Sequence, residues 1–385
     1  MKSKRVLKPI VGIVLSILIL IGIIAVLFKV FIYKVEESNK VEEVVEYIPV
    51  AENYSAQLYM AGDALLHGAV YTDAKQADGT YDFSSMFENI APIFQNCDLC
   101  YYNQETILGG TSLGLSSYPR FNSPQEFGDN MIDIGFNLVS TANNHSLDKD
   151  ETGIINSLEY WSTKDVVTAG TYLSQEDRDT IEVHDVNGIS YAFLAYTYGT
   201  NGLEPPKGKE YLVNVYNEEM LKNDVSKANE LADVVIVSMH WGVEYTFEPT
   251  PEQEHMAHVL ADAGADIVIG AHPHVIQPVE WIDDTIVYYS LGNMISAQDG
   301  TMKKIGMIGG VRIDKTVIDG KSTIEISQPK ADLIYNYYDN GYKNIKLYLF
   351  SSLTDEILKD HETIYEDYKK IITKRDDTIR IGGFE

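Results

Sequence analysis

Two histidines, His272 and His274, stand on either side of Pro273, and only Ala271 separates them from the short apolar run of residues 267–270. β-Branched residues followed by a glycine predict a buried strand there. Proline biases the residue before it toward an extended backbone, in which residues two apart project to the same side. We therefore expect both imidazoles to point one way at the end of a rigid strand, which suits a metal ion better than a core.

Side chains that can bind a metal or move a proton also follow the ends of other predicted strands. In open α/β sheets the ligand site lies outside the carboxyl ends of the strands. Because six separate segments each deliver such a residue to a strand end, the sequence predicts one shared site at one edge. Besides the histidine pair, these residues are Asp63, Glu105, Asn144 with His145, His240 and Asn293.

The expected metal ligands form a mixed nitrogen and oxygen set without a thiolate, which is typical of Mn²⁺, Fe or Zn²⁺ sites. Two carboxylates and three histidines exceed what one tetrahedral ion needs, so we expect two ions that share Glu105 as a bridge. The proposed ligands are Asp63, Glu105, Asn144, His240, His272 and His274.

Further residues are expected to act around the metals. His145 stands next to a ligand, so it would be free to donate a proton or to stabilise negative charge in catalysis. Asn103, Asn143, Trp241 and Asn293 are candidates for contacts with substrate or for support of the ligands.

Each of these residues also has an ordinary structural explanation. Asp63 follows a glycine and could form a turn, and Asn144 could form an Asx-turn. His240 could be a packed core histidine, and Trp241 is more typical of a core than of a substrate platform. His67, four residues after Asp63, is not included among the ligands. The joint pattern, rather than any single residue, predicts the metal site.

Short apolar strands alternate with helical patterns, which predicts an α/β fold. Helices are expected over residues 83–94, 152–161 and 218–231, and over residues 250–263, where Thr250 and Gln253 match a capping box and Gly264 is a stop signal. After residue 305 we expect a hairpin around Asp319-Gly320 and a closing helix over residues 353–372, without ligand residues.

Residues 9–28 form an apolar run long enough to cross a bilayer. Basic residues precede the run and acidic residues follow it, so the positive-inside rule places the N-terminus in the cytoplasm and the main domain outside the cell. No small-residue cleavage site ends the run, which favours an uncleaved signal anchor over a cleaved signal peptide. We divide the chain into a tip and anchor at 1–33, an acidic stalk at 34–54, a main domain at 55–300 and a C-terminal completion at 301–385.

The formal net charge of −27 argues against nucleic acid as a partner. It also argues against electrostatic capture of a polyanion unless metal ions or a local basic patch intervene. Two cysteines, Cys97 and Cys100, are too few for a four-cysteine zinc site. They could oxidise outside the membrane, but Cys100 is expected to be a small buried hydrophobic residue.

Six motifs in this order and spacing resemble the CapA family of capsule or poly-gamma-glutamate synthesis proteins, which is similar to the calcineurin-like metallophosphoesterases. The resemblance implies an α/β two-sheet sandwich flanked by helices in four layers. It also implies metal ligation by the six residues proposed above, with His145 in the place of the catalytic histidine. The motifs are Gly62-Asp63, Asn103-Gln104-Glu105, Ala142-Asn143-Asn144-His145-Ser146-Leu147-Asp148, His240-Trp241-Gly242, Gly270-Ala271-His272-Pro273-His274 and Tyr289-Ser290-Leu291-Gly292-Asn293.

Two positions depart from the metallophosphoesterase pattern. The usual Asp-x-His is Asp63-Ala64-Leu65 here, and Glu105 stands where an aspartate is usual. The number of metals and the hydrolytic activity therefore stay open at this point.

The sequence thus predicts a single-pass membrane protein that acts outside the cell in the biosynthesis or export of capsule or poly-gamma-glutamate. Its partners would be synthase subunits or the nascent polymer. If it is a metal-dependent hydrolase, its substrate would be a phosphoester or, as an alternative, the amide of a glutamyl chain. The alternatives are a non-enzymatic scaffold subunit of the synthase, and a secreted nucleotidase-like metallophosphoesterase unrelated to capsule.

Overall fold

The computed structural model describes residues 7–38 and 50–384, which fall into two separate units, Met1–Val50 and Ala51–Glu385. The first unit holds α1 (Leu7–Ser38). Among the described residues, its segment from Ile10 to Ser38 is the one helix long and apolar enough to cross a membrane. The helix continues into the predicted stalk. Residues 1–6 of the predicted tip and residues 39–49 of the stalk lie outside the described residues.

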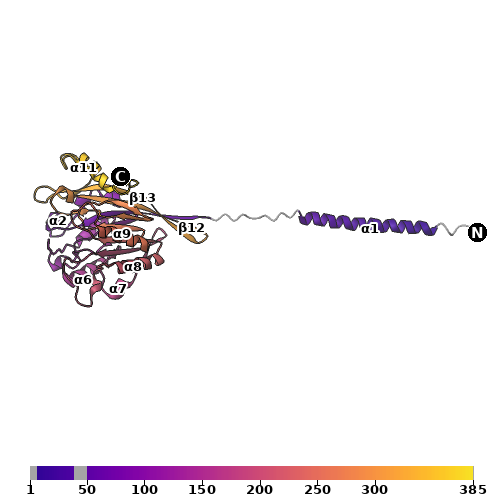
Figure 1. The fold of residues 1–385 in the computed structure, drawn as a ribbon, viewed down its shortest axis with the longest axis horizontal. Helices are drawn as coiled ribbons and strands as arrows, with labels where there is room; N and C mark the ends of the chain where they lie inside the picture. The colour runs from indigo at the N-terminus through magenta and orange to yellow at the C-terminus, as the bar shows by residue number, and fades with distance from the viewer. Residues whose placement is uncertain (1–6, 39–49, 385) are drawn as a thin grey trace, which may run out of the picture. The chain divides into compact units, whose positions relative to one another are not determined.

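The second unit contains two β-sheets (Figure 1). In the first sheet β1 is central: it pairs antiparallel with β12 on one side and parallel with β2 on the other, and β3 and β4 extend the parallel part. The strands in spatial order are β14 (Lys346–Leu349), β13 (Lys321–Tyr337), β12 (Ile305–Ile318), β1 (Glu52–Ala64), β2 (Leu99–Asn103), β3 (Leu138–Ser140) and β4 (Val167–Ala169), with β11 (Asn293–Ile295) on β1 and β15 (Arg380–Ile381) on β13.

The second sheet is parallel through its centre and antiparallel at both edges. Its strands in spatial order are β5 (Val183–Val186), β6 (Ile189–Thr197), β7 (Val234–His240), β8 (Ile267–Ala271), β10 (Thr285–Tyr288) and β9 (Val279–Ile282).

The two sheets pack face to face and helices cover both outer faces. Leu58, Tyr101, Ile236 and Ile269 are members of the core between the sheets. A second core lies between the first sheet and α2 (Gly68–Asp73), α3 (Ser84–Phe87), α4 (Ala91–Phe94), α5 (Glu126–Ile134) and α6 (Asp150–Trp161). A third core lies between the second sheet and α8 (Glu218–Leu231) and α9 (Pro251–Ala263). This arrangement confirms the expected α/β sandwich of two sheets flanked by helices in four layers.

Local sequence signals set most of these helices. The helix α9 has the predicted capping box of Thr250 and Gln253, and it ends at Gly264, whose φ of 98° is in the left-handed region. The prediction of a single helix over residues 83–94 was wrong: the structure has two single turns, α3 and α4, because Pro92 starts a new turn. The closing helix α11 (His361–Ile372) is shorter than predicted and begins after Asp360, whose φ is 60°.

The predicted hairpin is present as β12 and β13, joined at Asp319-Gly320, and it projects beyond the body of the sheets (Figure 1). The remaining short helices are α7 (Gln175–Asp179) and α10 (Thr301–Lys304). Cys100 is buried as expected, but the structure also joins it to Cys97 in a disulfide.

Candidate metal centre

The carboxyl ends of strands from both sheets meet at one edge of the sandwich. In the first sheet, Asp63 on β1 lies opposite Asn103 on β2 and opposite Asn293 on β11. In the second sheet, His240 ends β7 and pairs with Ala271, the last residue of β8, which His272 follows. The structure therefore brings residues that are up to 230 positions apart (63 to 293) to one place.

Two overlapping groups of side chains could each hold a metal ion. Glu105, His240 and His272 form one group, and Asp63, Glu105 and His274 form the other. Within each group the ligand atoms all lie within 4.8 Å of one another, and all five residues are buried. Glu105 belongs to both groups, which is the position expected of a carboxylate that bridges two ions.

Several polar atoms of the cluster have no hydrogen-bond partner in the part of the chain that the structure describes, and they indicate whether a metal fits there. Both carboxylate oxygens of Glu105 and Nδ1 of His272 are buried and have no hydrogen-bond partner among the described residues. A buried polar atom without a partner costs free energy, and a buried charge costs more, so native proteins pair such atoms or bind them to a metal. The donor set of carboxylates and imidazoles fits a divalent transition metal.

Burial and mutual charge control protonation in the cluster. Burial raises the pKa of the Glu105 carboxyl well above its usual range, with His274 opposing and Asp63 adding to the rise. Burial alone would lower the pKa of His274, but the Glu105 and Asp63 carboxylates outweigh it and raise that pKa to about 9. Burial lowers the pKa of His240, and it lowers that of His272 to about 3. Neutral imidazoles at His240 and His272 keep a lone pair for a metal.

The backbone of the histidine pair differs from the prediction. His272 has a φ of 96° and His274 a φ of 56°, so neither residue is extended and the expected backbone was wrong. Tertiary contacts override the local bias of Pro273: the His272 N–H donates to Asp63 Oδ2 (3.2 Å), and the Pro273 carbonyl accepts from the Tyr245 N–H (2.8 Å). The two rings lie 6.0 Å apart at 50°. Non-glycine residues in this region are strained, and such strain clusters at functional sites.

Asn144 contacts the cluster and His145 lies beside it. The Asn144 amide oxygen lies 3.0 Å from His240 Nε2. His145 Nδ1 lies 2.7 Å from the Asp148 carboxylate, which also accepts a hydrogen bond from the Phe121 N–H (2.6 Å). Asn143 accepts from the His145 N–H (3.0 Å) and so holds the loop in place. His145 belongs to neither group of possible ligands, and its paired Nδ1 leaves Nε2 for proton transfer.

The other predicted residues divide into two kinds. The Asn103 amide donates to Asp63 Oδ1 (2.8 Å), and Asn293 Oδ1 lies 3.0 Å from His274 Nδ1, so both orient proposed ligands. Trp241 is different: its indole N–H donates to the Tyr289 carbonyl (2.9 Å) inside the core between the second sheet and its helices. Trp241 therefore supports the fold there.

Two tyrosines that sequence reasoning missed border the cluster. The ring of Tyr198 lies 4.8 Å from that of His272 and is nearly parallel to His240, with centroids 6.4 Å apart. The ring of Tyr245 lies 6.1 Å from that of His274. Tyr198 directly follows β6, and its position just past the end of an apolar strand was a signal that could have found it.

His67 also lies near the cluster. Its ring packs edge-on against Phe121 (5.3 Å), and Phe121 packs in the same way against His145 (4.7 Å). Burial lowers the pKa of His67 to about 4, so its ring is neutral near pH 7.

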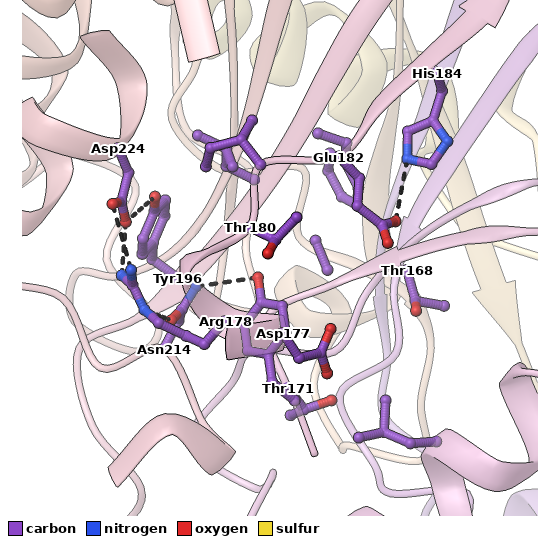
Figure 2. Close-up of a pocket in the computed structure, with 16 residues that line it drawn as sticks. Thr168, Thr171, Asp177, Arg178, Thr180, Glu182, His184, Tyr196, Asn214 and Asp224 are labelled. Carbon is purple, nitrogen blue, oxygen red and sulfur yellow. Dashed lines mark hydrogen bonds and ion pairs between the residues drawn. The ribbon is translucent and has the colours of Figure 1, made fainter. Parts of the chain in front are cut away.

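A separate pocket of about 160 Å³ opens beside β4 and β6, and none of the proposed ligands lines it (Figure 2). The charged groups in its wall bond one another: Arg178 donates to Asp224 (2.6 Å) and to Asn214 (3.0 Å), and the Tyr196 hydroxyl donates to Asp224 (3.0 Å). We place the candidate chemistry at the buried cluster because unpaired donor atoms converge there.

Known proteins resemble this chain over most of its length. The family described as bacterial capsule synthesis protein PGA_cap matches residues 57–298. The PGA biosynthesis protein CapA of Bacillus subtilis is 30% identical over 267 residues, which cover 66% of this chain and 67% of that protein. The capsule biosynthesis protein CapA of Bacillus anthracis is 29% identical over 271 residues, which cover 68% of this chain and 65% of that protein.

Two solved structures resemble the arrangement of sheets and helices. A hypothetical protein from Thermus thermophilus gives a TM-score of 0.44 at 16% identity and covers 70% of this chain and 98% of its own. The calcineurin-like phosphoesterase YfkN from Bacillus subtilis gives a TM-score of 0.41 at 12% identity and covers 82% of this chain and 99% of its own. Likenesses of this size say nothing about activity.

Proposed function

This chain belongs to the bacterial capsule synthesis protein family PGA_cap, and on that premise we propose that it acts in the biosynthesis or export of capsule polymer, specifically poly-gamma-glutamate. The relative from Bacillus subtilis is named for PGA biosynthesis and the one from Bacillus anthracis for capsule biosynthesis. The partners would be synthase subunits or the nascent polymer.

The proposal includes a membrane anchor. The helix α1 would be an uncleaved signal anchor in the cell membrane, with residues 1–33 as cytoplasmic tip and anchor and everything after them outside the cell. Residues 34–54 would be the stalk, and residues 301–385 would complete the domain formed by residues 55–300. With this topology the cluster would lie outside the cell, where exported polymer would reach it.

We further propose that the cluster is a metal-dependent hydrolase site. The observation that carries this proposal is Glu105, a fully buried carboxylate whose two oxygens have no hydrogen-bond partner among the described residues and which both ligand groups share. Two divalent ions bound there, Mn²⁺, Fe or Zn²⁺, would supply the Lewis acidity that phosphoester hydrolysis needs.

The chain's own residues would orient that chemistry and move the proton. Asp63, Glu105, Asn144, His240, His272 and His274 would hold the ions. Asp148 holds His145 by Nδ1 and would stabilise the imidazolium, so His145 Nε2 can give a proton to the leaving oxygen.

Metal analysis and hydrolysis of 4-nitrophenyl phosphate by the full-length protein in detergent would test this. We expect His272→Ala to lose both metal and turnover, because it removes a ligand. We expect His145→Ala to keep its metal and to lose about 10²–10⁴-fold in kcat. His255→Ala is the control, since His255 lies on the surface and pairs with Glu218. A wild-type protein that binds no divalent metal would refute the hydrolase site.

One feature favours the non-enzymatic scaffold as a second candidate. Leu65 is buried and apolar at the position where metallophosphoesterases carry a histidine, so the site has one imidazole ligand fewer. If the protein is a scaffold, the wild type and His145→Ala should bind synthase subunits equally well, and neither should show turnover. Release of phosphate from nucleotides, without any effect of the protein on capsule, would instead indicate the nucleotidase-like alternative.

A further inference from the structure

A closed loop of contacts lies beside the metal cluster and joins His274, Asn293, Gln298 and Tyr245. Asn293 Oδ1 lies 3.0 Å from His274 Nδ1, and the Asn293 amide donates to Gln298 Oε1 (2.9 Å). The Gln298 amide donates in turn to the Tyr245 hydroxyl (3.3 Å), and the Tyr245 ring lies 6.1 Å from that of His274. Tyr245 is therefore fixed in place next to a proposed metal ligand.

Lys303 contacts two members of this loop, Asn293 and Tyr245. Its carbonyl oxygen accepts a second hydrogen bond from the Asn293 amide (2.9 Å), which fixes the backbone of α10 at this point. Its ammonium nitrogen lies 4.8 Å from the centre of the Tyr245 ring, within the range of a cation–π contact. The side chain of Lys303 thus lies against the ring that borders His274.

In the part of the chain that the structure describes, no carboxylate neutralises this ammonium. None of the ion pairs there includes Lys303, although the chain has 57 acidic residues and 30 lysines and arginines. Glu244, the neighbour of Tyr245 in sequence, accepts a hydrogen bond from the Tyr245 hydroxyl and keeps its charge, but it forms no ion pair with Lys303 among the described residues. On the His145 side, by contrast, Arg120 pairs with Asp150 at 2.9 Å. A cation beside His274 is therefore free to take an anionic partner.

We propose that Lys303, resting on the ring of Tyr245, binds a negatively charged group of the substrate that does not itself react, namely a carboxylate or a second phosphoryl group. The ammonium of lysine is a compact charge on a flexible stem and binds one such group without strict geometry. Because this contact is the same before and during reaction, it lowers KM and leaves kcat unchanged. The inference rests on the proposed hydrolase function, and a glutamyl chain would supply such carboxylates.

Matched substrates test the assignment in the full-length protein. Phenyl phosphate carries only the reacting group, 4-carboxyphenyl phosphate adds a remote carboxylate, and 1,4-phenylene bisphosphate adds a remote phosphate. We expect Lys303→Gln to raise KM about tenfold for at least one of the two doubly charged substrates, and to leave phenyl phosphate unchanged. The substrate with the larger change identifies the anion, and Lys303→Arg should restore much of the loss. Lys321→Gln, in the exposed hairpin turn, is the matched control. Equal changes for all three substrates would overturn the proposal.

A readout without catalysis separates this inference from the hydrolase function. The amine of Lys303 is acetylated in the full-length protein with and without tri-γ-glutamate or inorganic phosphate, and modification is followed by peptide mass spectrometry. We expect one of these anions to protect Lys303 and not Lys321. If an anion protects Lys303 but the protein hydrolyses no phosphoester, the anion-binding site is supported and the hydrolase function is contradicted. Hydrolysis with neither protection nor a change in KM would show that Lys303 only packs on Tyr245.

Discussion

His145 and Asp148 form a pair beside the metal cluster, joined through Nδ1 of the imidazole. The Asp148 carboxylate is 1% exposed and lies 2.7 Å from His145 Nδ1. It is also held by the Phe121 N–H, so it cannot turn away. A fixed acceptor at Nδ1 selects the tautomer of the ring and aims Nε2 outward.

We expect Asp148→Asn to keep the fold and the metal but to lower kcat about 10²-fold, the lower end of what a positioned acid or base contributes. The Phe121 N–H and His145 Nδ1 both contact Oδ2 of Asp148, so the asparagine oxygen can take that place and keep both contacts. The neutral amide would no longer stabilise the positive charge on a protonated His145 ring, which is the expected cause of the loss. Turnover, KM and metal content of the purified variant check this. A normal kcat would mean that His145 takes no part in proton transfer, and a loss of metal would mean that Asp148 supports the ligands instead.

At the residue level, the sequence predicted side-chain identities better than backbone shapes. The structure brings the six proposed ligands into one buried place, because strand ends are readable from apolar runs and the polar residues that follow them. The backbone of His272 and His274 was mispredicted because proline sets only a local bias, and a hydrogen bond to a strand residue 209 positions earlier outweighs it. Tyr198 and Tyr245 were missed because an aromatic residue in a loop has no ligand signature.

The strand ends can converge only because two glycines let backbones approach closely. A Cβ at Gly62 would lie 1.8 Å from the Gly292 carbonyl oxygen, and one at Gly270 would lie 1.9 Å from the Tyr289 carbonyl oxygen. Gly270 is the fourth residue of β8 and stands two positions before His272. Its neighbours in space include backbone and the indole nitrogen of Trp241, which cannot move aside cheaply.

We expect Gly270→Ala to destabilise the protein by at least about 3 kcal/mol, because the methyl group overlaps a strand backbone in the core. If the variant folds, β8 must shift, and the histidine pair with it, so metal binding should fall as well. Urea unfolding and metal analysis measure the two effects. Gly199→Ala, where nothing lies within 4 Å of the added methyl, is the control and should unfold like wild type. A stable variant with a full metal complement would contradict this account of β8.

Helices and strands with their own local signals were predicted closely, and those that depend on packing were not. The helix α8 begins and ends at the predicted residues, and α9 has the predicted cap. Residues 83–94 carry enough apolar side chains for a helix, but they break into α3 and α4, which pack separately under the first sheet. The closing helix α11 starts late because residues 354–358 form a separate turn, in which the Ile357 and Leu358 N–H groups both donate to the Thr354 carbonyl, and Asp360 then has a left-handed φ of 60°.

At the scale of the molecule, an ion pair of a lysine and an aspartate connects the two sheets away from the metal cluster. Lys315 on β12 lies 2.6 Å from the carboxylate of Asp233, which stands just before β7, and the Ser190 hydroxyl on β6 donates to the same oxygen (2.7 Å). The side chains of Lys315 and Asp233 are only 17% and 16% exposed. Burial alone would raise the pKa of Asp233, but the bonds from Lys315 and Ser190 outweigh it and hold that pKa below its usual value.

We therefore expect Asp233→Asn to lower the free energy of unfolding by about 1–2 kcal/mol at pH 7. Since the pKa of Asp233 is lower in the folded state, its contribution is complete above the unfolded value near 4 and is lost as the pH falls further. The difference between wild type and variant should hence shrink below about pH 4. Urea unfolding at several pH values tests this. Asp367→Asn, at an exposed pair with Lys370, should show no measurable change. A difference that grows in acid would contradict the assignment.

The fold class could be predicted from the sequence, but the order and pairing of the strands could not. Alternating strands and helices indicated an α/β fold, and the family resemblance implied the two sheets and four layers that the structure has. The assignment of each strand to a sheet could not be obtained from local signals. The pairing of β1 with β12, for example, joins Ala56 to Ile313, and no local pattern in either segment specifies the other.

The central place of β1 has a consequence for how the molecule is made. Folding slows as contacting residues lie further apart in the sequence, because long loops must close before such contacts form. A chain that emerges N-terminus first leaves one side of β1 without its partner until β12, more than 240 residues later, has been synthesised. Asn293, His272 and His274 also arrive late. We expect the nascent chain to need protection from aggregation during synthesis, and the cluster to become able to load metal only after the last strands are in place.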